Sequence, residues 1–266
     1  MEALRELESW VTARGLDGSY LRRYYSFSYG RWYRGSYAGY VIGCNLGCVF
    51  CWATFKDRLD SGKFYSPAQV VEKLIEGGRR WGARVLRLSG GEPTVGFDHL
   101  LEVVKLFGKL GEGRTLIVET NGILLGYSRT ASEELASRVA HGTVLRVSIK
   151  GATPQDFEKL TGAPAEYFDV QLRALENLVR AGLEPGAGVT VAVMASFSEP
   201  RDLATLLLRL ASVDPKLAKV AELEVVKLYP KVRSSLERVG LRPRWYIEPG
   251  TSSRKALKPG NHLGVE

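Results

Sequence analysis

Residues 37–51 read YAGYVIGCNLGCVFC, an aromatic and β-branched run that ends at Cys44 and continues to Cys48 and Cys51. These three are the only cysteines among 266 residues. An odd number of cysteines in so short a stretch cannot be a disulfide framework, and such a group more often binds metal. The stretch therefore predicts a strand that delivers three sulfur ligands to one loop.

The type of metal follows from ligand number. Structural zinc normally takes four ligands, and the three histidines, His99, His141 and His262, lie far from the loop in sequence. Catalytic zinc held by three thiolates would be unusual. A [4Fe–4S] cluster also takes four ligands, usually Cys, so three cysteines would leave one iron open for a substrate or cofactor. We favour the cluster, with zinc and metal-free buried cysteines as alternatives.

The spacing C-x3-C-x2-C, with Phe50 before the last cysteine, resembles the radical S-adenosylmethionine (SAM) superfamily. The resemblance implies that Cys44, Cys48 and Cys51 hold a [4Fe–4S] cluster whose open iron binds the amino and carboxylate groups of SAM. It implies that Phe50 packs against the adenine. It also implies that the reduced cluster cleaves SAM to methionine and a 5′-deoxyadenosyl radical, which takes hydrogen from a substrate, with an electron donor of the ferredoxin or flavodoxin class.

The rest of the chain alternates short apolar strands with amphipathic helices, a pattern typical of α/β folds with a parallel sheet. Both an open doubly wound sheet and a curved partial barrel fit this pattern, and the resemblance implies the partial (β/α)6 barrel. We expect one domain, with an aromatic and basic N-terminal extension (1–36), a barrel core (37–230) and a C-terminal helix and tail (231–266). Strands are expected at 37–43, 85–88, 116–118, 144–149, 189–194 and 223–228.

Helix signals separate these strands. Pro67 opens a helix that ends near residues 77–78, and Thr130 with Glu133 predicts a capping box for a helix through Val139. Further helices are expected around 100–107, from 153 to 181, at 201–212 and at 232–239.

The segment SGGEP at 89–93 follows the second strand. Its glycines let the backbone approach a ligand, and Glu92 can accept a hydrogen bond from an ammonium group. An ordinary strand-to-helix turn is the alternative. The segment resembles the family's G-G-E motif, which implies that Gly90, Gly91 and Glu92 bind the amino group of the methionine part of SAM.

The third strand ends in Thr120 and Asn121, preceded by Glu119. Asn-Gly is also a common turn dipeptide. In the family, the equivalent T-N-G strand end lines the SAM site, so the resemblance implies that Thr120 and Asn121 bind SAM, with Glu119 as a weaker candidate.

The fourth and fifth strands end in further candidates. Alternation puts Ser148 and Lys150 on one face, and an inward lysine should meet a carboxylate, which SAM supplies. Met194, with Ser196, is expected beside the adenosine, although core packing accounts equally well for Met194.

Three hypotheses for the function remain open. Residues 148–162 (SIKGATPQDFEKLTG) resemble the D-x-K…L-T-G region of glycyl-radical activating enzymes of the pyruvate formate-lyase type, with Ser148 in place of Asp. That resemblance implies a partner protein as substrate. The net charge of +8 and the segment 20–40, with seven of the twelve tyrosines and four arginines, favour modification of a nucleotide or RNA. A non-catalytic iron–sulfur or zinc protein is the third.

Composition sets the remaining expectations. With 45% hydrophobic and 25% charged residues, and no long apolar run or secretion signal, we expect a globular cytoplasmic protein without a membrane partner. As an alternative to a role in binding a nucleotide or RNA, the segment 20–40 could be a hairpin that packs its tyrosines on the barrel edge and leaves its arginines in solvent. The basic tail from Arg242 to Lys258 is expected either to close over the substrate or to be mobile.

Overall fold

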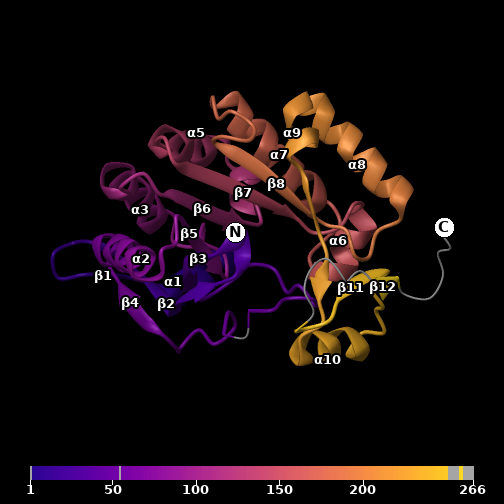
Figure 1. Cartoon of the computed structure of the whole chain (residues 1–266), viewed down its shortest axis with the longest axis horizontal. Helices are drawn as coiled ribbons and strands as arrows, with labels where there is room; N and C mark the ends of the chain where they lie inside the picture. Colours follow the sequence, from indigo (N-terminus) through magenta and orange to yellow (C-terminus); the bar gives the residue numbers. More distant parts are fainter. Residues whose placement is uncertain (1, 54, 251–257, 260–266) are drawn as a thin grey trace.

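The computed structural model describes residues 2–53, 55–250 and 258–259 (Figure 1). Its main sheet contains six parallel strands that follow one another in chain order. This confirms the predicted α/β fold with a mostly parallel sheet. The strands are β3 (Ser36–Val41), β5 (Val85–Gly90), β6 (Thr115–Thr120), β7 (Thr143–Ile149), β8 (Val189–Met194) and β9 (Glu222–Glu224).

The N-terminal segment extends the same sheet with antiparallel strands. The long strand β2 (Tyr20–Gly30) pairs with β3, and β1 (Thr12–Arg14) and β4 (Lys63–Tyr65) pair with β2. Helix α1 (Glu2–Val11) packs Val11 into a small apolar cluster with Ile42 and Val95. The sheet path therefore begins at β1 and ends at β9, and these two edges do not pair with each other.

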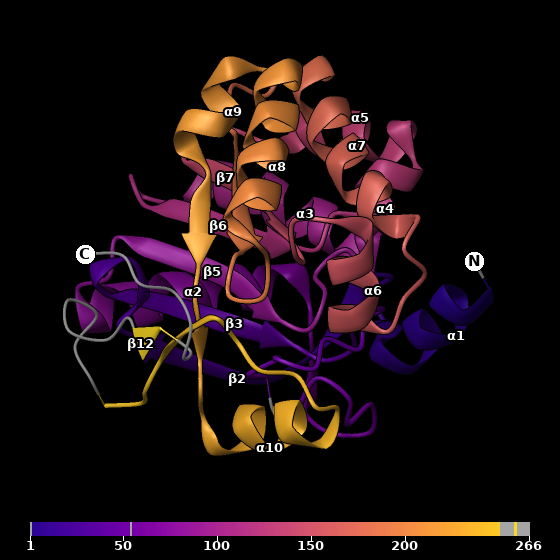
Figure 2. The ribbon, with the colours of Figure 1, turned by 90° about the vertical axis from the view of Figure 1, so that its right-hand side faces the viewer.

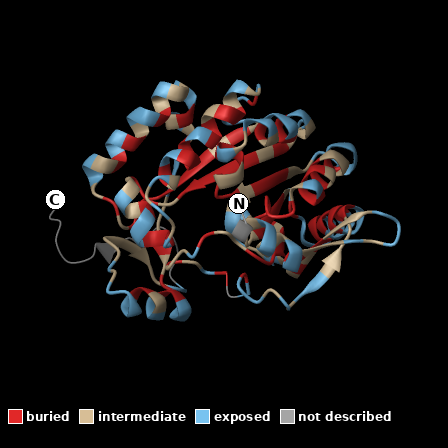
Figure 3. Cartoon of the chain, turned by 180° about the vertical axis from the view of Figure 1, so that it is seen from behind, coloured by how far each residue is buried: buried red, intermediate tan, exposed pale blue. Residues whose placement is uncertain are grey.

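Helices cover one face of this sheet (Figure 1). Their apolar stripes pack on the strands and their polar stripes face solvent, so red buried strands lie behind helices with pale blue outer faces in Figure 3. The helices are α2 (Pro67–Trp81), α3 (Phe97–Leu110), α4 (Ile123–Tyr127), α5 (Arg129–Arg138), α6 (Pro154–Thr161), α7 (Tyr167–Arg180), α8 (Pro200–Val213) and α9 (Pro215–Val220).

The predicted capping box at Thr130 is wrong. Helix α5 begins at Arg129, and its N-cap is Ser128, whose hydroxyl accepts a hydrogen bond from Ala131 N at 3.1 Å. Ser128 takes this role because it already has an extended backbone, with ψ of 107°.

The predicted strand 223–228 divides into two. Residues Glu222–Glu224 join the main sheet as β9, whereas β10 (Val226–Lys227) pairs with β11 (Trp245–Ile247) in a second sheet that includes β12 (Lys258–Pro259). The chain changes sheets because Val226 N donates to the hydroxyl of Ser196, beyond the end of β8. Helix α10 (Pro230–Arg238) follows and lies apart from the helical layer, at the lower end of Figure 2.

Two further expectations concern membrane-spanning segments and the basic tail. No helix in the described part of the chain is long and apolar enough to cross a membrane. Within the predicted basic tail from Arg242 to Lys258, residues 251–257 lie outside the described residues.

Candidate functional site

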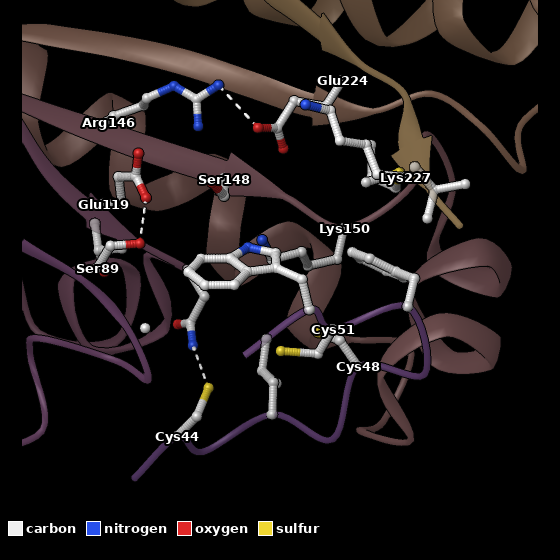
Figure 4. A pocket seen from close by; sticks show the side chains of 18 of the residues that line it. Cys44, Cys48, Cys51, Ser89, Glu119, Arg146, Ser148, Lys150, Glu224 and Lys227 are labelled. Atoms are coloured by element: carbon white, nitrogen blue, oxygen red, sulfur yellow. Dashed lines mark hydrogen bonds and ion pairs between the residues drawn. The ribbon is translucent and has the colours of Figure 1, made fainter. Parts of the chain in front are cut away.

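One cavity of about 510 Å³ opens at the carboxyl ends of the parallel strands (Figure 4). Side chains from the cysteine loop and from the ends of β5, β6, β7, β8 and β9 line it. In parallel α/β folds, this edge is where reacting groups gather. Most of the predicted site residues line the cavity, including the weaker candidate Glu119: Cys44, Cys48, Phe50, Cys51, Gly90, Gly91, Glu92, Glu119, Thr120, Asn121, Ser148, Lys150 and Met194.

The cysteine loop is held by the segment that follows β7. Gly47 N donates to Thr161 O at 3.0 Å, and Val49 N donates to Leu160 O at 2.9 Å. The Leu160-Thr161-Gly162 segment thus holds the loop through its backbone. This contact gives the segment a structural role that does not require a partner protein.

The G-G-E turn packs directly on the strand that precedes Cys44. Gly91 N donates to Val41 O at 2.8 Å and Glu92 N donates to Gly43 O at 2.7 Å. A Cβ atom on Gly91 would overlap the Gly43 carbonyl oxygen. Glycine is required here because two backbones touch, and this contact fixes the turn against the start of the cysteine loop.

The Glu92 carboxylate is buried and joins two strand ends. Its Oε1 accepts hydrogen bonds from Thr94 N at 3.0 Å, Thr94 Oγ1 at 2.8 Å and Thr120 Oγ1 at 2.7 Å. Its Oε2 accepts from Asn121 N at 2.7 Å. Glu92 therefore orients Thr120 and Asn121, and its Oε2, with one bond, has capacity for a further donor.

Asn121 connects this network to the cysteines. Its Nδ2 donates to Asn45 Oδ1 at 2.7 Å and lies 3.9 Å from Cys44 Sγ. We name the group Cys44, Cys48, Cys51, Glu92 and Asn121 the cysteine end of the cavity.

Lys150 follows β7 on the same side as Ser148, as alternation predicts. In the described part of the chain, no carboxylate pairs with Lys150 Nζ, so this ammonium can pair with an incoming one. The fully buried Gln171 fixes the position: its Oε1 accepts from Lys150 N at 3.1 Å, and its Nε2 donates to Asn121 O and Ser148 O. The sequence analysis did not identify Gln171.

Phe50 and Met194 form an apolar wall. Both belong to one buried cluster, with Leu160 and Val226 among its members, and the Phe50 ring centroid lies 5.9 Å from that of Phe197. Such a wall suits a flat ring. Ser196, expected beside the adenosine, does not line the cavity; it is fully buried and bonded to Val226.

A second group of ionisable residues lies along the strands. Arg87 Nη2 contacts both carboxylate oxygens of Glu119, at 2.8 and 2.9 Å. Arg146 Nη2 contacts Glu222 Oε2 at 2.6 Å and Glu224 Oε1 at 3.0 Å. We name these five residues the charged end. Figure 4 shows Arg146, Glu119 and Glu224 across the cavity from the cysteines.

The rim beside the charged end is aromatic. Trp32, in the short 3-10 helix Trp32–Arg34 before β3, is 43% exposed, and Lys227 Nζ lies 3.9 Å from the centroid of its ring. Tyr33 Oη donates to Glu119 Oε1 at 3.3 Å. The residues from 32 to 34 thus contact both the charged end and β10.

The cysteines suit an iron–sulfur cluster. All three thiols are free and line the same cavity. Among the described residues, no three His, Cys, Asp or Glu side chains form a group that could hold one metal ion, as a zinc site with Zn–S bonds of about 2.3 Å requires. A cluster binds each thiolate through a different iron and does not need this convergence.

Burial opposes ionisation of two of the thiols, Cys44 and Cys48. Burial, reinforced by the Glu92 charge, raises the pKa of Cys44 to about 12, and burial raises the pKa of Cys48 to about 11. Metal binding must therefore displace protons from both.

The fold and site together define a class of enzyme. A radical SAM superfamily model matches residues 40–207, so the chain belongs to this superfamily and is a radical SAM enzyme. The superfamily implies a [4Fe–4S] cluster and SAM. In fold, the chain resembles SuiB from Streptococcus suis bound to S-adenosylmethionine, with a TM-score of 0.51 and 16% identity over 75% of this chain and 45% of that one.

The chain is also similar in sequence to curated proteins with a named activity. A probable GTP 3′,8-cyclase from Methanothermobacter thermautotrophicus is 31% identical over 53% of this chain and 43% of the relative. Another, from Methanosarcina acetivorans, is 28% identical over 72% of this chain and 59% of the relative. The chain therefore spans about half the length of these curated relatives.

Proposed function

We propose that this radical SAM enzyme acts on a nucleotide or nucleoside. The observation that carries the proposal is the two-ended cavity, in which a set of cysteines faces buried arginines, carboxylates and an aromatic rim. Arginine, carboxylate and aromatic groups are the ones that bind nucleobases. Support comes from the similarity to the probable GTP 3′,8-cyclases, whose name describes a nucleotide substrate.

In this proposal, the cysteine end holds the cofactors. Cys44, Cys48 and Cys51 are the cluster ligands, and the ammonium of Lys150 pairs with the SAM carboxylate. When bound, the cluster and SAM supply a 5′-deoxyadenosyl radical able to remove hydrogen from a substrate.

The other predicted SAM residues complete this site. The Glu92 network orients the strand ends that face the methionine part, and the apolar wall holds the adenine ring and excludes water. The residues with these roles are Phe50, Gly90, Gly91, Glu92, Thr120, Asn121, Ser148 and Met194.

The observations favour this substrate class over a glycyl-radical partner protein. The L-T-G segment, which suggested an activating enzyme, has a structural role in holding the cysteine loop. The charged end presents arginine and glutamate side chains, and a peptide glycine has no side chain that these groups could bind.

The test is 5′-deoxyadenosine formation by the anaerobically reconstituted protein with SAM and dithionite. We expect GTP, GMP, guanosine or RNA to raise the yield above the substrate-free level, and Cys48→Ala to abolish it. If only a protein fraction raises the yield, and an EPR doublet of a glycyl radical appears on mixing, the proposal is wrong.

A further inference from the structure

The charged end contains buried hydrogen-bond donors without partners. The side chains of Arg87 and Arg146 are only 5% and 6% exposed. Within the described part of the chain, Arg87 Nη1 and Arg146 Nε have no hydrogen-bond partner. Leaving a buried donor unpaired is unfavourable, so these two guanidinium groups are not fully satisfied by their carboxylate partners, and both belong to residues that line the cavity.

A third buried arginine shows that burial does not require unpaired donors. Arg22 is 1% exposed, and its nitrogens donate to Val95 O at 2.6 Å, Val11 O at 3.3 Å and Glu92 O at 3.4 Å. Arg22 does not line the cavity, whereas Arg87 and Arg146 do. Arg114 Nε, outside the cavity, also has no partner among the described residues, but its side chain is 17% exposed. Arg87 and Arg146 therefore differ from Arg22 in their unpaired donors and from Arg114 in lining the cavity.

Charge at this end argues against an anionic ligand. Two guanidinium groups face three carboxylates, and the nearby Lys227 supplies a third positive charge, so formal charges cancel. Burial raises the pKa of Glu119, but Arg87 and Arg146 more than offset this and hold it below its usual value. A phosphate would gain no net attraction here, which favours a neutral ligand with both acceptors and donors.

The rim favours a flat ligand. Trp32 and Tyr33 present aromatic rings beside the charged end, and the Tyr33 ring centroid lies 5.4 Å from the Arg87 guanidinium carbon. Tyr33 has a left-handed backbone, with φ of 54°, which is costly for a residue other than glycine. Its hydroxyl nevertheless contacts Glu119, so this conformation places the ring at the charged end.

These requirements match the guanine base. Guanine offers O6 and N7 as an acceptor pair, which arginine contacts with two hydrogen bonds, and N–H groups that a carboxylate can accept. Glu222 Oε1 and Glu224 Oε2, which Arg146 does not contact, are available as acceptors. Adenine places an amino donor where guanine has O6, opposite the arginine donors.

The charged end also lies within reach of the cofactors. Arg146 and Ser148 are two positions apart on β7 and point to the same side, so about 7 Å of strand separates them. Resting on the proposed function, we infer that the charged end binds the guanine base of the substrate through Arg87, Arg146 and the β9 carboxylates, with Trp32 and Tyr33 against the ring.

Calorimetry with the reconstituted protein, SAM and no reductant tests the inference. We expect guanosine to bind at least about 10-fold more tightly than adenosine, since one correct arginine–base pair gives discrimination of this size. Inorganic triphosphate should not compete. Equal affinity for the two nucleosides, or competition by triphosphate, would overturn the inference.

Substitutions of Arg146 test whether guanosine binds at the charged end. Arg146→Met should weaken guanosine binding at least about 10-fold, and Arg146→Lys should do so too because a lysine keeps the charge but not the planar pair of donors. Arg209→Met, which removes a surface arginine paired with Asp169 on the helical layer, is the matched control and should leave binding unchanged. Iron content should stay the same in all three, and unchanged guanosine affinity in both Arg146 variants would contradict the inference.

The two proposals can fail separately. If guanosine does not bind but another nucleoside or RNA raises 5′-deoxyadenosine formation, the guanine inference is wrong and the proposed function stands. If guanosine binds with the expected selectivity but no nucleotide or RNA supports turnover, the proposed function is wrong and the binding site stands.

Discussion

The two ends of the cavity are built differently. The cysteine end consists of loop and strand-end residues, and its network of neutral groups and one carboxylate is closely hydrogen-bonded through Glu92. The charged end consists of residues inside strands that are far apart in sequence, and it keeps unpaired donors. A fully hydrogen-bonded polar network specifies one geometry, whereas a partly bonded one leaves donors that are costly to bury. The two ends should therefore respond separately to substitution, and four predictions test this.

The largest effect is expected from Cys48→Ala. Removing one of three ligands should abolish cluster assembly and all 5′-deoxyadenosine formation. Guanosine affinity should remain within about 2-fold, because distant sites contribute independently. Iron and sulfide content, visible absorbance and calorimetry measure these properties. A variant that keeps its brown colour, or that loses guanosine binding as well, would contradict the separation.

The next effect is expected from Arg87→Met. This change leaves the Glu119 carboxylate buried without its main partner, so we expect a loss of about 3–5 kcal/mol in the free energy of unfolding. Removing both charges in Arg87→Met/Glu119→Gln should recover most of that loss. Urea denaturation measures both.

Turnover should not recover with stability. Guanosine-dependent 5′-deoxyadenosine formation should stay at least about 10-fold reduced in both Arg87 variants, since neither has the base-contacting donor. If the double variant regains turnover, Arg87 serves only to balance Glu119.

Acid should affect both ends together, through the fold. His99 is buried against Tyr24, donates Nδ1–H to Tyr20 O at 2.8 Å and lies near the Arg22 charge; burial lowers its pKa to about 4. In the unfolded chain His99 binds a proton near pH 6.5, whereas in the folded protein it does so only near pH 4. The contribution of His99 to the free energy of unfolding is therefore complete above pH 6.5, and up to about 3 kcal/mol of it is lost as the pH falls towards 4.

Substitution of this histidine tests that source of acid sensitivity. His99→Gln should flatten the fall in unfolding free energy between pH 6.5 and 4, whereas His141→Gln, at an exposed position, should not. An unchanged slope in His99→Gln would show that other groups cause it.

The smallest effect is expected from Trp32→Ala. Stacking of a base on an aromatic ring contributes about 1–3 kcal/mol, so guanosine affinity should fall roughly 10-fold. Trp32→Phe should retain most of it, and cluster content should not change in either variant. If Phe and Ala weaken binding equally, the ring does not stack on the base.

Much of the fold and of the cysteine end could be predicted from sequence because their signals are local. Apolar strands and amphipathic helices repeat along the chain, and Cys44, Cys48 and Cys51 stand within one loop. Errors arose where neighbours compete, as at Ser128 and Thr130, or where a distant hydroxyl redirects the chain, as Ser196 does with Val226.

The charged end could not be predicted because its signals are long-range. Arg87 and Arg146 are single charges in apolar strands, and each reads as a solvent-facing position. Their partners lie 32 and 76 residues away, and only the sheet order brings them together. Arg22 shows the same error: in a segment whose arginines could have been solvated, it is buried.

The contact between Trp32 and Lys227 has a consequence for biosynthesis. It joins the residues before the first parallel strand to those after the last, although 195 positions separate them in the chain. Until residues 222–227 have joined the fold, one side of the cavity lacks its wall, because Glu222, Glu224 and Lys227 line it. An iron centre installed at that moment would face water and oxygen on that side, so loading after chain release would protect it better.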